Sequence, residues 1–237
     1  MMSGKRWGYV VQFFCLLVFL GMSPFLIKMD GRKTMSVSSD SVRSQNVSDE
    51  VQPVVSLTFD VGLNASSIPF LFDVLMERKV RVTFFLIGEN VDKDEYEKIV
   101  KRMYEEGHLI GNHTYTHCNL SKLETGEAKK ELEQTDTVIE KITGKQPVFV
   151  RAPYGELPVD SEQDLNRIYI GWTVDPLDWM TEDTGAVVKT VVEEINPGDV
   201  ILLHDCYPSS VQAAIRIVDL LQGKGYEFVT VDHLIMD

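Results

Sequence analysis

The stretch VVSLTFD, residues 54–60, decides the fold of this chain. It is short, apolar and rich in β-branched residues, which is typical of a buried strand. It ends by carrying the carboxylate of Asp60 into the turn Val61-Gly62. A carboxylate at the end of a buried strand costs free energy unless it has a partner or a use. The stretch therefore predicts a core strand with a chemically active end.

Later apolar segments repeat this arrangement, each ending in polar residues that can do chemistry. The predicted strands are residues 54–60, 82–87, 109–110, 148–150, 169–174, 200–203 and 228–231. Helical patterns alternate with them, which favours parallel pairing. Chemistry collected at strand ends is typical of a β/α barrel with its active site on the carboxyl face. We predict an α/β fold, a distorted (β/α) barrel with about seven parallel strands.

The predicted helices begin at residues that favour helix starts, and their charged residues suggest exposed faces. Ser67, Thr184 and Ser210 stand where helical patterns begin, and Ser121 with Glu124 resembles a capping box. The helix that follows Glu124 carries many Glu and Lys residues, and these most simply form a solvated face.

The chain of 237 residues divides into three parts by composition. Residues 1–29 hold a basic start and an apolar stretch, residues 8–27, long enough as a helix to cross the roughly 30 Å of a bilayer core. We interpret them as an uncleaved membrane anchor, with a cleaved signal peptide as the alternative. Residues 30–52 are polar and aperiodic, typical of a flexible linker. We expect residues 53–237 to form one catalytic domain, exported and membrane-anchored, or secreted if the segment is cleaved.

The net charge of -13 excludes some classes of partner. Such a surface repels nucleic acid and anionic polymers, so a neutral or weakly charged substrate fits better. We expect a monomer. Three cysteines are too few for a disulfide framework. Two unpaired thiols at Cys118 and Cys206 are preferred to a bridge, because spacing alone does not show that two cysteines are close enough.

His113 and His117 stand four residues apart, a spacing that places both side chains on one face of a strand or of a helical turn. Both imidazoles could then reach one metal ion, although structural histidines would fit the same spacing. The other polar strand ends favour the metal, because Asp60, Arg151 and His204 should gather at the same rim.

Two further pairs of residues suggest acid and base chemistry. Arg151 beside the carboxylate of Asp60 would hold that group ionised and aimed. Asp178 and His204 each end a strand segment. A carboxylate bonded to one imidazole nitrogen fixes the tautomer and raises the pKa of the histidine, which then serves as a general acid.

With five ordered motifs, residues 53–237 resemble the polysaccharide deacetylases, the NodB-homology domain of carbohydrate esterase family 4. The motifs are Thr58-Phe59-Asp60-Val61-Gly62, His113-Thr114-Tyr115-Thr116-His117, Arg151-Ala152-Pro153-Tyr154-Gly155, Asp175-Pro176-Leu177-Asp178-Trp179 and Leu202-Leu203-His204. The resemblance implies a NodB-like barrel that hydrolyses N-acetyl groups on a glycan with a divalent metal, most often zinc, with cobalt or nickel as alternatives.

The resemblance also implies a role for each motif residue. His113 and His117 would bind the metal, which polarises the acetyl carbonyl and acidifies a water. Asp60 would be the base, held by Arg151, and His204, tuned by Asp178, would protonate the leaving amine. The backbone N–H of Tyr154 would stabilise the oxyanion, and Trp179 and Leu202 would line the pocket for the acetyl methyl group.

One position departs from the family pattern. Members usually carry a second Asp, the third metal ligand, where this chain has Val61. Some spore-type members have an apolar β-branched residue there too. Asp60, Asn64 or a water are possible substitutes for the missing ligand. The departure puts metal affinity in doubt and keeps two alternatives open: a glycan-binding pseudoenzyme on the same barrel, and an esterase that releases O-acetyl groups. The preferred substrate is peptidoglycan or another N-acetylglucosamine polymer.

Overall fold

The computed structural model describes residues 52–236 apart from 63–65, 160, 162–163 and 165. These residues belong to one compact unit, Asp49–Asp237. The predicted anchor at 1–29 and all but the last residue of the predicted linker at 30–52 lie outside the described residues. Among the helices of the described part, none is both long and apolar enough to span a bilayer.

Seven parallel strands form one sheet, which confirms the predicted α/β fold. The order along the sheet is β5-β4-β3-β2-β1-β6, and β7 pairs with the first residues of β1. The strands are β1 (Val54–Val61), β2 (Thr83–Leu86), β3 (Leu109–Asn112), β4 (Phe149–Val150), β5 (Ile168–Tyr169), β6 (Val200–His204) and β7 (Glu227–Phe228).

The segment that follows β5 closes the sheet into a distorted barrel. Its first part pairs with β4, where Ile170 donates a backbone hydrogen bond to Val150 at 2.8 Å. Its second part pairs with β6, because Val174 bridges Ile201 and accepts a hydrogen bond from the N–H of Leu202 at 3.0 Å. One short segment thus bonds to strands near both edges of the sheet, β4 and β6. Such a link is what closes a sheet into a barrel.

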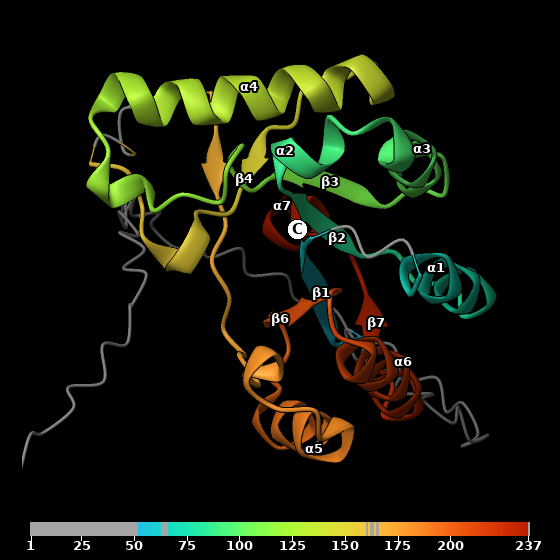
Figure 1. Ribbon diagram of the computed structural model, residues 1–237. Helices are drawn as coiled ribbons and strands as arrows, with labels where there is room; N and C mark the ends of the chain where they lie inside the picture. The colour runs from blue at the N-terminus through green and yellow to red at the C-terminus, as the bar shows by residue number, and fades with distance from the viewer. Residues whose placement is uncertain (1–51, 63–65, 160, 162–163, 165, 237) are drawn as a thin grey trace, which may run out of the picture. The chain divides into compact units, whose positions relative to one another are not determined.

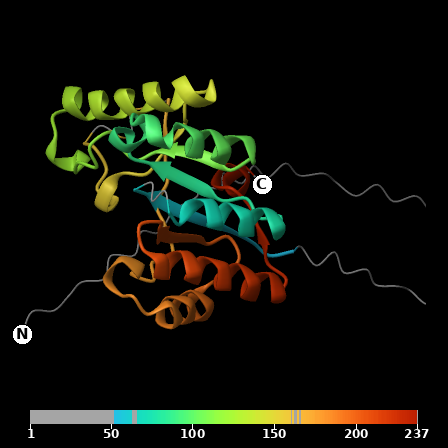
Figure 2. The ribbon, with the colours of Figure 1, turned by 45° about the vertical axis from the view of Figure 1, so that its right-hand side comes forward.

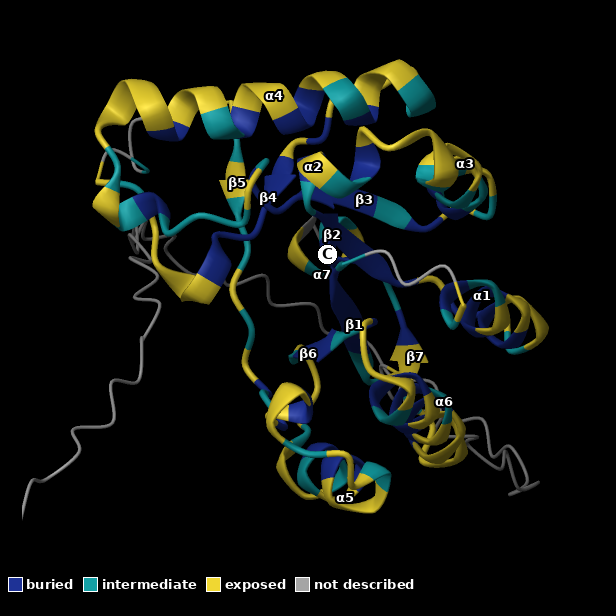
Figure 3. Ribbon diagram, in the orientation of Figure 1, coloured by how far each residue is buried: buried dark blue, intermediate teal, exposed yellow. Residues whose placement is uncertain are grey.

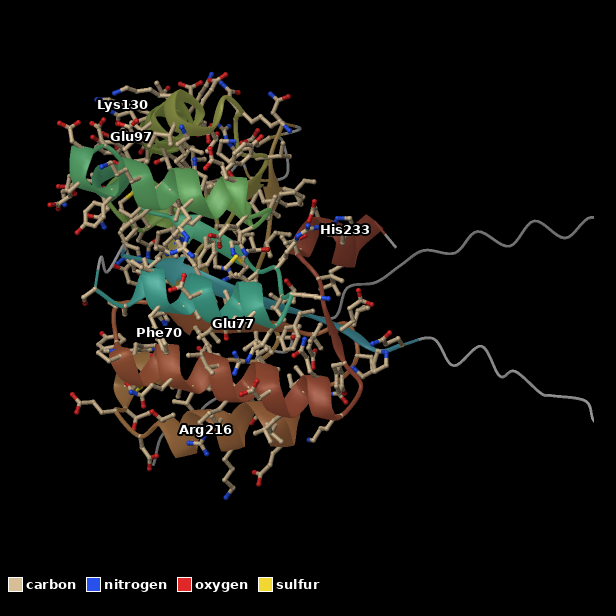
Figure 4. The ribbon with its side chains drawn as sticks, turned by 90° about the vertical axis from the view of Figure 1, so that its right-hand side faces the viewer. Phe70, Glu77, Glu97, Lys130, Arg216 and His233 are labelled. Carbon is tan, nitrogen blue, oxygen red and sulfur yellow. The ribbon has the colours of Figure 1, made fainter. Side chains whose placement is uncertain are left out.

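Helices cover the outside of the barrel, with their buried faces toward the strands and their exposed faces outward (Figure 1 and Figure 3). Charged side chains such as Glu97, Lys130 and Arg216 lie on the outer surface (Figure 4). The α-helices are α1 (Ile68–Glu77), α2 (Gly88–Val91), α3 (Glu97–Glu105), α4 (Thr125–Thr143), α5 (Thr184–Glu194), α6 (Pro208–Gly223) and α7 (Val231–Met236). Short 3₁₀ turns are η1 (Asp94–Tyr96), η2 (Leu120–Lys122), η3 (Pro153–Gly155) and η5 (Asp178–Met180).

Strand β1 is buried on both faces, and the two faces differ in chemistry. Val55, Leu57, Phe59 and Val61 pack in the main core between the sheet and the helices. The alternate residues Ser56, Thr58 and Asp60 face the barrel interior and are also buried. The barrel interior is therefore partly polar, and its polar groups need partners inside the barrel.

The amino end of the barrel is filled by α7, which lies at the opposite end from η3 (Figure 2). Val231 packs there in a small cluster with Phe85 and Phe149, and its N–H donates to the hydroxyl of Thr83 at 3.1 Å. The prediction of a strand through residue 231 was wrong beyond Phe228. The apolar run ends as a helix because it plugs the barrel and does not extend the sheet.

Several predicted helix starts were wrong in detail. Helix α4 begins after Glu124, and the N–H and hydroxyl of Ser121 both donate to Asn119 in η2. Ser67 is the N-cap residue of α1, as predicted, but its hydroxyl donates to the carbonyl of Asp205 and makes no cap hydrogen bond. Helix α5 is capped by Asp183, and Ser210 lies inside α6. The hydroxyls of Ser67 and Thr184 donate to carbonyls distant in the sequence, those of Asp205 and Ser209, and not to the first turn of their own helices.

The buried histidine His108 makes stability depend on pH. Its ring packs against Phe72 and Phe84, and its Nδ1 accepts the N–H of Val82 at 3.2 Å. Burial, followed by the charges of Arg81 and Arg102, lowers the pKa of His108 from 6.5 to about 4. The unfolded chain therefore binds this proton more tightly, by about 3 kcal/mol. Stability from the neutral ring is complete above pH 6.5 and is lost as the pH falls toward about 4.

We predict that His108→Asn, which keeps an acceptor for the Val82 N–H, weakens this dependence. Between pH 7 and pH 4.5, its free energy of unfolding should fall by about 2 kcal/mol less than that of the wild type. Urea unfolding at the two pH values measures the difference. His233→Asn, at an exposed position of α7, is the control and should keep the wild-type dependence. An equal decrease in the free energy of unfolding in all three proteins would contradict the prediction.

Candidate functional site

The carboxyl ends of the strands bring the predicted site residues together at one end of the barrel. Asp60 pairs in register with His204 on β6, and β3 ends at Asn112, directly before His113. Arg151 follows β4, and Asp178 begins η5 beside β6. This gathering is the predicted one, because parallel strands present their carboxyl ends at the same edge.

The guanidinium of Arg151 occupies the barrel interior and joins several strands. The side chain is 1% exposed, and its Nη1 donates to Asp60 at 3.0 Å and to the hydroxyl of Thr58 at 2.7 Å. Its Nη2 donates to the carbonyl of Gly171 at 2.9 Å and its Nε to that of Ile170 at 3.3 Å. A buried guanidinium needs such partners for all its donors.

An aromatic ring supports the guanidinium from one side. The ring of Phe85 lies 4.3 Å from the Arg151 guanidinium carbon, within the range of a cation–π contact. This ring needs the space beside it on β3, since a Cβ on Gly111 would lie 2.5 Å from it. The absence of a side chain at Gly111 therefore lets Phe85 take the position from which it contacts Arg151.

The carboxylate of Asp60 is ionised and fixed. Burial alone would raise its pKa, but the electrostatic interactions with His113, Arg151 and His204 and the hydrogen bond from Arg151 outweigh it and lower the pKa below the usual value. Arg151 holds Oδ1, whereas Oδ2 faces Nε2 of His113 at 3.5 Å. One carboxylate oxygen is thus anchored, and the other is directed toward the histidine pair.

His113 presents a lone pair to this space. Its Nδ1 lies 2.7 Å from the carbonyl of Arg151, and because a carbonyl only accepts, Nδ1 must carry the proton. Burial lowers the pKa of His113 more than the Asp60 charge and the Arg151 carbonyl raise it, so the ring is neutral. The Nε2 lone pair therefore faces an ionised carboxylate oxygen with no proton between them, an arrangement that suits a cation.

His117 lies beside His113, with ring centroids 4.9 Å apart, and also contacts the ring of Tyr154 at 5.1 Å. Burial, followed by the electrostatic interaction with His113, lowers the pKa of His117 to about 4, so this ring too is neutral. The predicted reason for the pairing was wrong. The two histidines lie in a loop, not on a strand or helix face, and backbone φ angles of 63° at Thr114 and 57° at His117 bring the rings together.

His204 and Asp178 form the second predicted pair. Nδ1 of His204 donates to Asp178 Oδ1 at 2.8 Å, and the backbone N–H of His204 donates to Oδ2 at 2.8 Å. Burial alone lowers the pKa of His204, but the hydrogen bond and charge of Asp178, with the charges of Asp60 and Asp175, outweigh it and raise the pKa. Nε2 of His204 is left for a partner outside this pair.

The predicted substrate-binding residues lie around this centre and differ in exposure. Tyr154 is 65% exposed, Trp179 50% and Leu202 3%. Leu202 alternates with the core residues Ile201 and Leu203, so its side chain faces the barrel interior. The N–H groups after Tyr154 donate within local turns, whereas the N–H of Tyr154 has no acceptor among the described residues.

Val61 lies on the opposite face of β1 from Asp60. It is fully buried in the main core and pairs with Leu86 of β2. Along the described part of the chain, no three His, Cys, Asp or Glu side chains are grouped so that they could hold a metal ion. The donor chemistry thus fits a cation at the two neutral histidines, with no third ligand grouped with them among the described residues. Asn64, one of the substitutes considered above, lies outside the described residues.

Sequence reasoning missed some residues that support the site. Asp205 accepts the N–H of Gly62 at 2.8 Å, and Asn90 donates to the Gly62 carbonyl at 3.1 Å, so the turn after Asp60 is held from both sides. Thr58 was quoted in a motif without a role, yet it bonds Arg151. Its place two residues before Asp60, on the same strand face, was the available signal.

Cys118 and Cys206 are not joined by a disulfide bond, as expected. The candidate site is recognised from the chemistry of its side chains and not from the volume of a cavity. A hollow of about 820 Å³ lies elsewhere, between α4 and residues 158–169. None of the predicted catalytic or metal-binding residues lines it.

Comparison with known families and proteins agrees with this geometry. Residues 48–170 match the family described as polysaccharide deacetylase. The chain is 36% identical over 194 residues to the peptidoglycan-N-acetylmuramic acid deacetylase PdaC of Bacillus subtilis, covering 82% of this chain and 41% of PdaC. It is 37% identical over 187 residues to a peptidoglycan-N-acetylglucosamine deacetylase of Bacillus cereus, covering 76% and 67% respectively. The chain spans about two fifths of the length of PdaC.

Solved structures are similar as well. The crystallised part of PdaC superposes with a TM-score of 0.74 at 36% identity, covering 78% of this chain and 91% of that chain. A mutant of a CE4 family pseudoenzyme with restored enzymatic activity gives a TM-score of 0.72 at 28% identity, covering 78% and 68%. The distorted NodB-like barrel is therefore confirmed.

We predict that Asp178→Asn lowers the pKa of His204, because the hydrogen bond to Nδ1 is kept while the charge that stabilises the imidazolium is lost. A titration of ¹³C-labelled histidine followed by NMR measures this pKa. Asp175→Asn is the control, because Asp175 raises the His204 pKa by charge alone and makes the smallest contribution. An equal or larger decrease in Asp175→Asn would show that Asp178 does not set the charge state of His204.

Proposed function

The chain belongs to the polysaccharide deacetylase family, and from this premise we propose that it is a metal-dependent hydrolase that removes N-acetyl groups from a glycan. The observation that carries the proposal is the pair of differently tuned groups at one barrel end. Asp60 is kept ionised beside Arg151, and His204 is given a raised pKa by Asp178. Groups whose pKa values are pushed apart in this way serve as base and acid of one reaction.

The proposed base is Asp60. Its Oδ1 is fixed by Arg151, and Oδ2 is available to take a proton from the attacking water. The lowered pKa keeps the carboxylate deprotonated at neutral pH, as a base requires. Arg151 positions this group and does not itself touch the reacting atoms.

The proposed metal ligands are His113 and His117, two neutral imidazoles with adjacent rings. A divalent ion held there, with zinc preferred and cobalt or nickel as alternatives, would polarise the acetyl carbonyl and lower the pKa of a bound water. The backbone N–H of Tyr154 would donate to the oxyanion that forms as the water attacks. Trp179 and Leu202 would enclose the acetyl methyl group.

The proposed acid is His204. Its Nδ1–H is committed to Asp178, so Nε2–H is the proton available to the departing amine. Because the pKa of His204 is raised, the imidazolium is present over a wider range of pH, and activity should decline as the pH rises through that pKa. Protonation lets the amine leave as the acetyl group passes to the water oxygen.

The preferred substrate is peptidoglycan or another polymer of N-acetylglucosamine. Support comes from the names of the relatives in two Bacillus species and from the acidic chain, which disfavours anionic polymers. An esterase that releases O-acetyl groups would use the same residues and differ only in the leaving oxygen. A panel of peptidoglycan, chitooligosaccharide and acetylated xylan separates the two.

One observation favours a second function, a glycan-binding pseudoenzyme. Val61 replaces a metal ligand of the family and is packed in the core, and a CE4 pseudoenzyme has a similar structure. The complete acid and base pairs argue for catalysis, since a binding module has no need of them.

We also propose that the domain works outside the cytoplasm as a monomer, tethered by residues 1–29 through the linker 30–52. The support is the basic start and apolar stretch in the sequence. Cell fractionation tests the tether: the full-length protein should partition with membranes. Recovery of a soluble protein without residues 1–23 would show a cleaved signal peptide.

We expect zinc-dependent acetate release from an N-acetylated glycan, and we expect His204→Ala to lower kcat by about 100- to 10,000-fold with glycan affinity nearly unchanged. The imidazolium acts in the transition state and contributes little to ground-state binding. Acetate release with and without zinc, and glycan binding, measure the two effects. His233→Ala is the control. Glycan binding by the wild type without acetate release from any of the three substrates would favour the pseudoenzyme.

The structure sharpens the expectation for Val61→Asp. A carboxylate in the core costs several kcal/mol unless it gains a partner, so this variant should be less stable than the wild type without metal. Zinc supplies a partner and should raise the melting temperature more in Val61→Asp than in the wild type. Val61→Ala, which brings no carboxylate, should show no added zinc effect. Equal zinc-induced shifts in the two variants would show that a carboxylate at position 61 does not reach the metal.

A further inference from the structure

The loop that carries the two histidines, residues 113–117, has a backbone that its residues disfavour. Thr114 and His117 have φ angles of 63° and 57°, and neither is glycine. A left-handed backbone costs about 1–3 kcal/mol at such positions and persists only where the surroundings impose it, most of all for β-branched Thr114. Other parts of the structure must therefore hold this loop.

Helix α2 and the end of strand β3 hold the first half of the loop. The N–H groups of Gly88 and Glu89, at the start of α2, donate to the carbonyls of Thr114 and Tyr115, both at 2.9 Å. The side chain of Asn112, at the end of β3, accepts the N–H of Thr114 at 2.8 Å. These contacts hold the first half of the loop.

The second half of the loop is held from α4 by Glu131. Its Oε2 accepts the N–H of Tyr115 at 3.0 Å and that of Thr116 at 2.8 Å. Its Oε1 accepts the hydroxyl of Thr116 at 3.1 Å. Hydrogen bonds to a carboxylate are about twice as strong as neutral ones.

The two histidines depend on this loop to different degrees. The ring of His113 is fixed by its own hydrogen bond to the Arg151 carbonyl. The ring contacts of His117 are with His113 and Tyr154, and Tyr154 is itself largely exposed. The position of the His117 ring is therefore set mainly by its backbone, which Glu131 holds through the two preceding residues, Tyr115 and Thr116.

We propose that Glu131 is a positioning residue that fixes His117 beside His113, so that the two imidazoles bind one metal ion. The proposal rests on the proposed function in one respect, the role of the histidines as metal ligands. Glu131 is an exception to the predicted solvated face of α4: it contacts the loop, whereas Lys129, Lys130 and Glu133 are exposed. Glu133, two residues on, is exposed and pairs with Lys129 at 3.5 Å.

The full-length chain tests the proposal with two variants and a matched control. Glu131→Ala removes all the acceptors, Glu131→Gln keeps one acceptor oxygen without the charge, and Glu133→Ala changes an exposed glutamate of the same helix. Hydrogen exchange by mass spectrometry, on zinc-free protein, reports the loop in peptides spanning residues 113–118. Zinc titration by calorimetry reports the ligand pair, and thermal unfolding confirms that each variant is folded.

In Glu131→Ala we expect exchange in the loop peptides to be at least about 10-fold faster and zinc to bind about 10- to 100-fold more weakly, as for other residues that orient ligands. Glu131→Gln should lie between Glu131→Ala and the wild type, and Glu133→Ala should match the wild type. If Glu131→Ala does not fold, Glu131→Gln, which has the same shape, decides the comparison.

Loop exchange unchanged in both Glu131 variants would overturn the proposal, as would an equal loss of zinc affinity in Glu133→Ala. Failure of the proposed function is seen separately, because the wild type would then bind no zinc. In that case, the exchange data and the NMR resonances of the His117 ring in zinc-free protein still decide whether Glu131 positions this residue.

Discussion

The buried ion pair of Arg151 and Asp60 is the interaction on which the rest of the structure depends. A guanidinium inside a barrel is tolerable only if its donors and its charge are matched, and here the matching groups come from β1 and from the segment after β5. The backbone carbonyl of Arg151 also accepts a hydrogen bond from His113 and fixes its ring. One residue thus sets the charge of the proposed base and the tautomer of a proposed metal ligand.

The second constraint is the local strain at the rim of the barrel. Of the five residues other than glycine with positive φ in the described part of the chain, four lie in the motifs of the site: Thr114, His117, Tyr154 and Leu177. Side chains and neighbouring N–H groups hold these backbones, as Asp175 does for Leu177 at 2.9 Å. Such strain aims side chains in directions that regular strands and helices do not provide.

The two faces of β1 explain why core residues and site residues are neighbours in the sequence, and why an apolar residue stands at position 61. Side chains alternate, so the residues that complete the main core and the residues that carry the chemistry share one strand. Val61 belongs to the core face, where it adds apolar packing and removes a carboxylate from the family's ligand set. A substitution at Val61 therefore changes the packing of the core and the proposed metal site together.

The sequence alone determined the strand and helix alternation, the parallel sheet, and the membership of Asp60, His113, His117, Arg151, Asp178 and His204 in one site, because hydrophobic periodicity and strand ends are local signals. Only the tertiary structure decided how these residues act. The tautomer of His113 depends on a carbonyl 38 residues away, and Glu131 is one of many charged residues on its helix until the loop packs against it. The end of β7 likewise depended on a contact made across the fold, the hydrogen bond from the N–H of Val231 to the hydroxyl of Thr83. Hydrogen-bond partners far apart in the chain leave no periodic trace in the sequence, so packing alone reveals them.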